Sequence, residues 1–391
     1  MIYLDHNATT APLPEVNEAV LRAQRELWGN PSSTHRAGQA ARAALELARR
    51  QTARLIGAKP VELVLTSGGT ESNAIALAQC RRWISTAVEH AAVREPLDHK
   101  PGSEALPAWM PVDLRPDGAV DLAALTDRLE AAASAAADAG EPTVGCSIQW
   151  ANNETGRIQP MPAIGQVVAQ VRSRWRGRGV DVLWHSDATQ AVGKLPVDVA
   201  AIGVDLMSFA AHKFHGPKGV GGLYVRRGVR LRPVQLGGPQ ELSRRGGTEN
   251  TPGVIGMGVA AEAAAAWLAG EGPTQVAALR DRFERAVLTD HAGAVVHHAG
   301  EPRLWNTACI GFPGLSAEGV LVALSERGVC VSAGAACSSG SLEPSPVLRA
   351  FGVPEPAAFG SVRFSLGRST TDEEVDAAAA AVQASISTIS L

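Results

Sequence analysis

Short apolar runs that suit β-strands alternate with helical patterns through most of the first 255 residues. The strand-like runs are residues 62–65 (ELVL), 143–148 (TVGCSI), 181–185 (DVLWH), 205–209 (DLMSF) and 220–225 (VGGLYV). Residues 40–56 instead carry apolar side chains near helical spacing, and Gly57 follows them as a helix stop. Strands separated by helices predict an α/β fold with a mainly parallel sheet that helices cover on both faces.

The last third of the chain has a more mixed pattern, which indicates a second domain. Residues 131–142 are rich in alanine and fit a helix end followed by a loop, whereas a long alanine-rich helix begins near Gly256. We place a domain boundary there. A chain of 391 residues with 45% hydrophobic side chains is long enough for one large and one small domain.

Composition excludes several classes of protein. The net charge of −3, with both signs spread along the chain, argues against a nucleic-acid surface. Five cysteines without paired short spacings predict neither a disulfide framework nor a zinc site, so no metal is expected and a reducing cytoplasm is the simpler location. The N-terminus lacks a signal-peptide pattern, and the weakly polar stretch 254–270 contains Glu262 and is expected to be too short to span a bilayer.

Polar residues follow four of the strand-like runs directly. These segments are 68–72, 152–154, 187–190 and 212–213. Ligands of open parallel sheets bind at the carboxyl ends of the strands. We therefore expect these four segments, although far apart in sequence, to meet along one edge of the sheet.

Three of these segments carry groups that one cofactor needs together. The turn TSGGTES has two glycines before Thr70, and a turn of this kind at a helix start can bind phosphate, although it can equally be an ordinary capped turn. Asp187 could pair with a protonated ring nitrogen, and Gln190 could face the same ligand. Lys213 ends the run SFAAHK before GPKGVGG, where a desolvated amine can form a Schiff base. Together they describe a site for pyridoxal 5′-phosphate.

At these residues the chain resembles the cysteine desulfurases of the NifS/IscS type, within the class-V aminotransferases of fold-type I. The resemblance runs from residue 3 to about residue 373 and keeps the family's order. Its stretches are YLDHNATT, GNPSSTHRAG, TSGGTESNA, VEHAAV, NNETG, HSDATQAVGKLPVD, SFAAHKFHGPKG, RRGGTENTPG, GAACSSGSLEPSPVLRAFG and SVRFSLGRSTT. It implies a large domain over 14–255 with a seven-stranded sheet. It also implies a smaller α+β domain over 1–13 and 256–391 that carries the catalytic cysteine loop.

The resemblance also implies a role for each site residue. Lys213 would hold the cofactor covalently and move the substrate's α-proton, His90 would stack on the ring and relay protons, and Cys337 would be the nucleophile. The implied cofactor ligands are Gly69, Thr70, Asn153, Asp187, Gln190, His212, Lys213 and Thr248. Thr248 would come from the neighbouring subunit of a homodimer. Asn153 and Arg363 would bind the substrate carboxylate.

Cys337 distinguishes this resemblance from one to a plain aminotransferase. It lies in AGAACSSGS, whose small residues favour a mobile loop, whereas Cys80, Cys146, Cys309 and Cys330 fit small buried residues. By the resemblance, its thiolate would take sulfur from L-cysteine as a persulfide and release L-alanine. The group that deprotonates Cys337 is not identified.

The chain departs from the family's pattern at several points. Ala210 stands where a serine usually binds the phosphate, and Ala335 replaces a serine of the cysteine loop. The chain also ends soon after a final helix, which leaves the sulfur-acceptor protein open among iron–sulfur assembly, tRNA thiolation and related trafficking.

Three alternatives remain beside the desulfurase interpretation. A class-V enzyme acting on selenocysteine or another amino acid would share most of these residues. A non-catalytic docking protein would be favoured by loss of Lys213 or Cys337, and both are present. A nucleotide-binding Rossmann protein is disfavoured, because no G-x-G-x-x-G follows the first strands.

Overall fold

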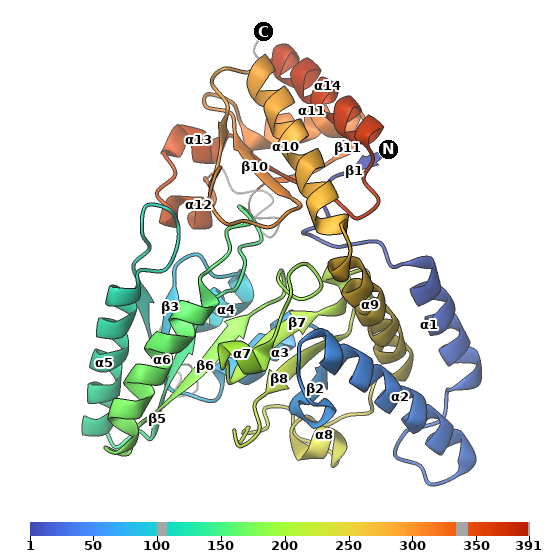
Figure 1. Ribbon diagram of the computed structural model, residues 1–391, viewed down its shortest axis with the longest axis vertical. Helices are drawn as coiled ribbons and strands as arrows, with labels where there is room; N and C mark the ends of the chain where they lie inside the picture. The colour runs from blue at the N-terminus through green and yellow to red at the C-terminus, as the bar shows by residue number, and fades with distance from the viewer. Residues whose placement is uncertain (100–107, 334–342, 390–391) are drawn as a thin grey trace.

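The computed structural model describes residues 1–99, 108–333 and 343–389 as two units, a larger α/β unit below a smaller one in Figure 1. The strands are β1 (Ile2–Tyr3), β2 (Leu63–Thr66), β3 (Arg82–Thr86), β4 (Ala108–Val112), β5 (Thr143–Ser147), β6 (Asp181–Asp187), β7 (Leu206–Ala210), β8 (Gly221–Val225), β9 (Val295–Val296), β10 (Thr307–Gly311), β11 (Val329–Cys330), β12 (Ser332–Ala333) and β13 (Ser361–Ser365).

The helices are α1 (Pro14–Glu26), α2 (Arg36–Leu55), α3 (Gly69–Leu77), α4 (Ala91–Asp98), α5 (Leu122–Asp138), α6 (Met161–Arg176), α7 (Val199–Ile202), α8 (Gln240–Ser243), α9 (Thr251–Ala269), α10 (Gly272–Asp290), α11 (Ala317–Glu326), α12 (Pro346–Ala350), α13 (Glu355–Phe359) and α14 (Asp372–Ile389). Two short 3₁₀ turns, η1 (Pro60–Glu62) and η2 (Ala211–Lys213), complete the elements.

The larger unit is built on a seven-stranded sheet with the order β2-β8-β7-β6-β5-β3-β4. Strand β8 pairs antiparallel with both β2 and β7, and the other pairings are parallel. The predicted mainly parallel sheet of seven strands is therefore confirmed. Each of the five strand-like runs forms a strand, because its apolar side chains are buried on the sheet.

Helices cover both faces of this sheet, as predicted. Alternate residues of β2 face opposite sides: Leu63 and Leu65 pack in the core that includes α2, α5, α6 and α9, whereas Val64 packs with Ile75 and Ala76 of α3. Helix α9 lies against α1 and α2 (Figure 1). A side chain at Gly258 would meet Ala48 Cα at 2.7 Å, so glycine permits this close helix contact.

The packing of helix α9 changes where we place the domain boundary. Its residues Val254, Met257, Ala260, Ala261 and Ala264 belong to the core of the larger unit, so we propose a boundary near Gly270 rather than at 255/256. By length and composition α9 is apolar enough to cross a membrane, so the expectation that this stretch is too short does not hold. Its buried face against α1 and α2 accounts for that composition.

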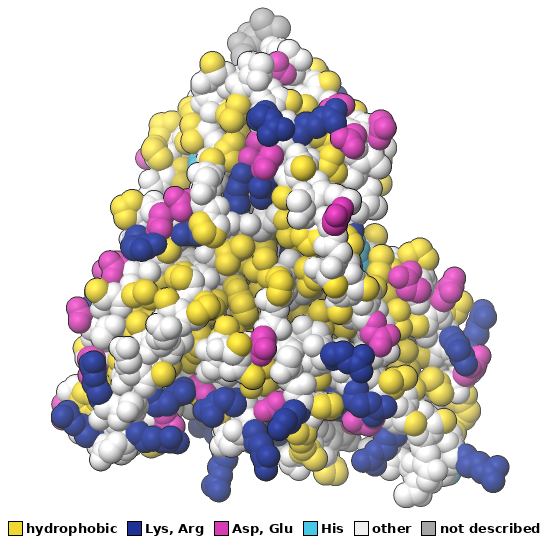
Figure 2. Space-filling model, in the orientation of Figure 1, with side chains coloured by type: hydrophobic (Ala, Val, Ile, Leu, Met, Phe, Trp, Pro, Cys, Tyr) yellow, Lys and Arg dark blue, Asp and Glu magenta, His cyan; other side chains and the backbone are white. Residues whose placement is uncertain are grey.

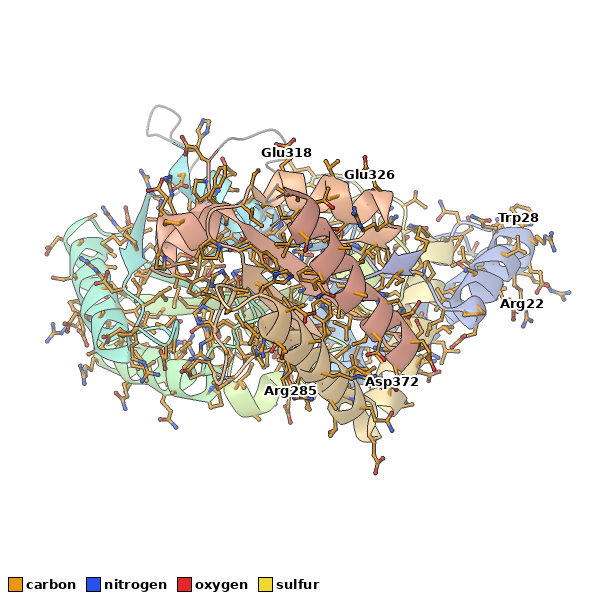
Figure 3. The ribbon with its side chains drawn as sticks, turned by 90° about the horizontal axis from the view of Figure 1, so that it is seen from above. Arg22, Trp28, Arg285, Glu318, Glu326 and Asp372 are labelled. Atoms are coloured by element: carbon orange, nitrogen blue, oxygen red, sulfur yellow. The ribbon has the colours of Figure 1, made fainter. Side chains whose placement is uncertain are left out.

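The smaller unit combines a four-stranded antiparallel sheet, in the order β12-β13-β10-β9, with the parallel pair β1–β11. The pair β1–β11 brings the N-terminal strand into this unit. Helices α10 and α14 lie side by side across it, as Figure 3 shows from above, and Phe283 of α10 contacts Phe364 of β13. Both signs of charge are interspersed on the face drawn in Figure 2.

Candidate active site

A cavity of ≈ 430 Å³ lies at the carboxyl ends of β2, β5, β6 and β7. The four polar segments predicted from the sequence contribute to its wall and therefore meet at one sheet edge. Nine predicted site residues line it: Gly69, Thr70, His90, Asn153, Asp187, Gln190, His212, Lys213 and Arg363. Its size suits a cofactor with a small substrate.

Lys213 ends η2, which follows β7 without a break. Its Nζ donates to two main-chain oxygens of the N-terminal segment, at 2.8 Å to Asn7 O and 2.8 Å to Ala8 O. Beside it, His212 Nδ1 lies 3.2 Å from Thr9 Oγ1. Burial, followed by the charge of Lys213, lowers the pKa of His212 to about 4, so its imidazole is neutral at pH 7.

Asp187 is buried at the end of β6 and has both carboxylate oxygens bonded. Oδ2 accepts from Asn73 Nδ2 at 2.8 Å, and Oδ1 accepts from the main-chain N of Thr189 at 2.9 Å. Asn73 was not predicted, although it lies within the quoted stretch TSGGTESNA. It acts by orienting the carboxylate that faces the cavity.

His90 is the N-cap of α4, and its Nδ1 accepts from the main-chain N of Ala92 at 3.0 Å. That bond leaves the proton of the neutral ring on Nε2. Burial lowers the pKa of His90, with Asp187 opposing that shift. The ring is thus a neutral imidazole with a fixed tautomer on the cavity wall.

The glycine turn places the start of α3 beside the cavity. Gly68 adopts φ 151°, and a second hollow at this helix start is lined by Gly69, Thr70, His212 and Lys218 among others. A side chain at Gly69 would meet Thr189 Oγ1 at 2.9 Å. The main-chain N–H groups at a helix N-terminus, with a lysine nearby, favour an anion at this point. Lys218, which sequence reasoning missed, adds the charge.

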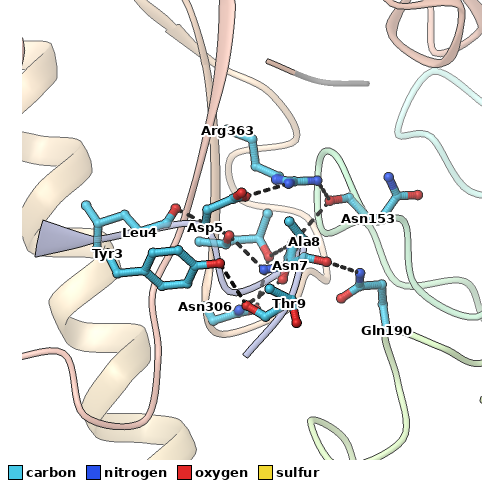
Figure 4. Close-up of polar contacts among 12 residues, drawn as sticks. Tyr3, Leu4, Asp5, Asn7, Ala8, Thr9, Asn153, Gln190, Asn306 and Arg363 are labelled. Carbon is cyan, nitrogen blue, oxygen red and sulfur yellow. Dashed lines mark hydrogen bonds and ion pairs between the residues drawn. The ribbon is translucent and has the colours of Figure 1, made fainter. Parts of the chain in front are cut away.

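Arg363 lies on β13 of the smaller unit and is buried. Its Nη1 donates to Asn153 O at 2.9 Å and its Nη2 pairs with Asp5 Oδ1 at 2.7 Å, as Figure 4 shows. Within the described part of the chain its Nε is buried without a hydrogen-bond partner. A carboxylate would satisfy that N–H, so the guanidinium suits a substrate carboxylate.

Two buried carboxyl groups on the cavity wall were not predicted as site residues, although Glu154 lies in the predicted segment 152–154. Glu89 Oε1 accepts from the main-chain N of Gln149 at 2.7 Å, while its Oε2 has no partner among the residues described. Burial raises the pKa of Glu89 well above its usual value. Glu154 accepts from Ser345 Oγ at 2.6 Å, and burial raises its pKa as well. The glutamate beside His90 in VEHAAV was the available signal.

The two remaining predicted residues are Cys337 and Thr248. Cys337 lies outside the described residues. Thr248 is exposed and lies away from the cavity, so its predicted contribution to a neighbouring subunit stays a prediction. Among the other cysteines, Cys80, Cys146 and Cys309 are buried as expected, and Cys330 is half-buried. Over the described ranges, His, Cys, Asp and Glu form no group of three suited to a metal ion.

Comparison with known families matches the class-V aminotransferase model over residues 2–378. The chain therefore belongs to the class-V aminotransferase family, which confirms the predicted resemblance at this level.

Individual relatives indicate a narrower group within this family. A cysteine desulfurase of Cereibacter sphaeroides is 41% identical over 387 residues, covering 96% of this chain and 93% of that protein. The cysteine desulfurase NifS of Azotobacter vinelandii is 42% identical, covering 96% and 90%. A solved NifS-like protein superposes with a TM-score of 0.86 at 33% identity, covering 99% of each chain. A structure of SspA in complex with cysteine superposes with a TM-score of 0.75 at 29% identity, covering 95% of this chain and 100% of that one.

Proposed function

We propose that this protein is a pyridoxal phosphate-dependent cysteine desulfurase. It converts L-cysteine to L-alanine and passes the sulfur, through a persulfide on Cys337, to an acceptor protein. The observation that carries the proposal is the convergence of Lys213, Asp187, Gln190 and the glycine turn on one cavity. The chain that builds this cavity is about 41% identical over nearly its full length to proteins named cysteine desulfurase.

The residues present suit pyridoxal phosphate at both ends of the molecule. The start of α3 with His212 and Lys218 suits the phosphate, and the fixed carboxylate of Asp187 suits a protonated ring nitrogen. Gln190 offers an amide to the phenolic oxygen, and the amine of Lys213 can hold the carbonyl carbon. When bound, this cofactor supplies an electron sink for negative charge at the substrate's α-carbon.

The remaining steps fall to side chains of this chain. Arg363 binds the substrate carboxylate through its Nε–H, which has no partner among the described residues, and Asn153, whose main-chain oxygen accepts from Arg363, joins it from the cavity wall. The amine of Lys213, when uncharged and free, could take the α-proton of the substrate. The carbonyl oxygens of Asn7 and Ala8 then hold the resulting ammonium in place. Neutral His90, with its proton on Nε2, can relay a proton across the cavity.

Sulfur transfer is assigned to Cys337. Its thiolate attacks the sulfur of bound cysteine, an S–S bond forms, and the C–S bond of the substrate breaks. The electron pair of that bond stays with the carbon skeleton, which takes up protons and leaves as alanine. The outer sulfur remains on Cys337 as a persulfide.

Alanine and sulfide release from L-cysteine, in the presence of dithiothreitol, tests the proposal. The wild type should be yellow and release both products. Cys337→Ala should stay yellow and release neither, whereas Cys330→Ala, a matched control on β11, should behave as the wild type. A yellow wild type that is inert towards cysteine would contradict the proposal and direct the assay to selenocysteine or another amino acid.

The proposal extends to assembly and location. A homodimer would let the exposed Thr248 of one subunit reach the cofactor phosphate of the other. A reducing compartment such as the cytoplasm would preserve the thiol of Cys337. The acceptor would be a scaffold or carrier protein of iron–sulfur assembly, tRNA thiolation or a related pathway, and no contact with nucleic acid or membrane is required.

A further inference from the structure

A second lysine, Lys194, lies one hydrogen bond behind the cavity wall. The sequence has five lysines. Lys194 is 4% exposed, although lysine is among the residue types that are most rarely buried. A buried amine that lies beside the cavity without lining it indicates a role in positioning the residues of the cavity wall.

Two neutral amide oxygens accept from this amine. Its Nζ donates to Asn7 Oδ1 at 2.7 Å and to Oε1 of Gln190. Its own backbone is held at both ends: the main-chain N donates to Ala191 O at 3.0 Å, and Trp305 Nε1 donates to Lys194 O at 2.7 Å. The amine is therefore fixed relative to both amides.

Among the residues that the structure describes, no carboxylate forms an ion pair with Lys194. Burial lowers its pKa well below the usual value, and the positive charges of Lys213, Arg363 and Arg368 lower it further. Both partners are uncharged. In either protonation state, however, the amine presents N–H donors to these two oxygens. Its geometric effect does not depend on charge.

That effect is to decide which way the amide of Gln190 points. An amide has a donor end and an acceptor end of nearly the same shape, so its neighbours choose between two orientations. Lys194 requires the oxygen of Gln190 on its own side. Nε2 then faces the opposite side, where it donates to Asn7 O at 2.9 Å (Figure 4) and where Gln190 lines the cavity. With the amide reversed, the oxygen would face the carbonyl oxygen of Asn7.

We propose that Lys194 is a positioning residue that locks the Gln190 amide with its N–H side towards the cavity, ready to donate to the phenolic oxygen of the cofactor. This inference rests on the proposed pyridoxal phosphate site. It adds a residue that touches neither cofactor nor substrate.

The experiment compares Lys194→Met, Gln190→Met and the double variant, with the exposed Lys59→Met as matched control. Two quantities are measured in each full-length protein: the dissociation constant of pyridoxal phosphate and the pH midpoint of its visible absorption band. Loss of one donor should weaken cofactor binding about tenfold in each single variant. Both single variants should move the pH midpoint in the same direction, because each removes the same N–H from the phenolic oxygen.

The double variant decides whether Lys194 acts through Gln190. We expect it to bind pyridoxal phosphate no more weakly than Gln190→Met alone, because Lys194 has no amide left to orient once Gln190 is replaced. Additive losses would overturn the inference. So would a Lys194→Met protein with the affinity and midpoint of Lys59→Met.

Circular dichroism checks that each variant folds. If Lys194→Met does not fold, Lys194→Gln takes its place in the same cycle; because its amide keeps an N–H donor, its midpoint should shift from the wild type in the same direction as that of Gln190→Met but by less. Wild-type protein that binds no pyridoxal phosphate would contradict the proposed function and this inference together. Wild-type binding with an unaffected Lys194 variant would contradict this inference alone.

Discussion

The cavity has two walls that differ in what they contribute. The wall at the carboxyl ends of the large sheet provides groups that carry charge or protons, chiefly Lys213, Asp187 and His90. The wall formed by the N-terminal segment 5–10 provides mostly carbonyl and amide groups. Asn7 in this segment accepts from Lys213, Gln190 and Lys194 of the larger unit and bonds to Thr307 and Ser365 of the smaller one. The N-terminal segment thus aligns reactive groups of the larger unit and also ties them to the smaller one.

The largest expected effect is on the sheet wall. Replacing Lys213 with alanine should remove the visible absorption band and lower alanine release by at least about a thousandfold, because the amine is both cofactor anchor and base. The spectrum and the alanine assay measure this, with Lys59→Ala as the control. An intact absorption band in Lys213→Ala would remove this residue from the proposed mechanism.

The N-terminal wall should respond in stability as well as in activity. Asn7→Ala removes one buried hydrogen-bond partner from each of Lys194, Asn306 and Thr307 and should lower the free energy of unfolding by about 3 kcal/mol. Urea unfolding measures this change. Asn17→Ala, on the exposed face of α1, is the control. Equal stability of the two variants would show that the segment aligns the site without holding the units together.

Acid should weaken the structure through His6, a buried histidine of the N-terminal segment. Burial, followed by the charges of His215 and Lys194, lowers the pKa of His6 from 6.5 to about 4. The unfolded chain then binds more protons than the folded one between these values. Stability is therefore full above pH 6.5 and falls as the pH drops towards 4.

Replacing His6 with glutamine removes the proton that the unfolded chain binds at this position between pH 4 and 6.5. In urea unfolding between pH 4 and 6.5, the slope of the unfolding free energy against pH should fall by up to about 1.4 kcal/mol per pH unit. His99→Gln, at the end of α4, serves as the control. An unchanged slope would mean that His6 is protonated in the folded protein.

The smallest expected effect is on cofactor binding and concerns a hydroxyl group that the sheet wall lacks at Ala210. Ala210 lines the cavity at the end of β7, where the family usually has serine. Ala210→Ser should tighten pyridoxal phosphate binding by about tenfold, because a hydroxyl would donate to the phosphate. Equilibrium titration of the apoprotein measures it. An unchanged dissociation constant would place the phosphate away from Ala210.

Much of the fold could be predicted, because short apolar runs are typical of strands in a sheet that helices cover on both faces. Strands β2, β5, β7 and β8 were located within one residue at each end, and β6 extends two residues beyond its predicted end. Strands β3 and β4 were missed. Strand β4 has the sequence AWMPV, and its Pro111 is tolerated because β4 is the edge of the sheet, a position that no local pattern reveals.

The site shows the same division between local and long-range information. Lys213 and Asp187 could be predicted because both follow strands and have side chains with distinctive chemistry. Asp5, Asn7 and Lys194 could not, although all three lie in stretches that carry the family resemblance. An asparagine or a buried lysine has no recognisable role until its partners are known.

By itself, therefore, the sequence determined most of the sheet, many of the residues at its carboxyl edge and the family to which the chain belongs. Those properties depend on short-range patterns of side chains. Only the tertiary structure placed segment 5–10 between the two units, where Asp5 pairs with Arg363 across 358 residues of chain. Such contacts form when the two hydrophobic cores pack together. Their hydrogen bonds produce no periodic pattern in the sequence.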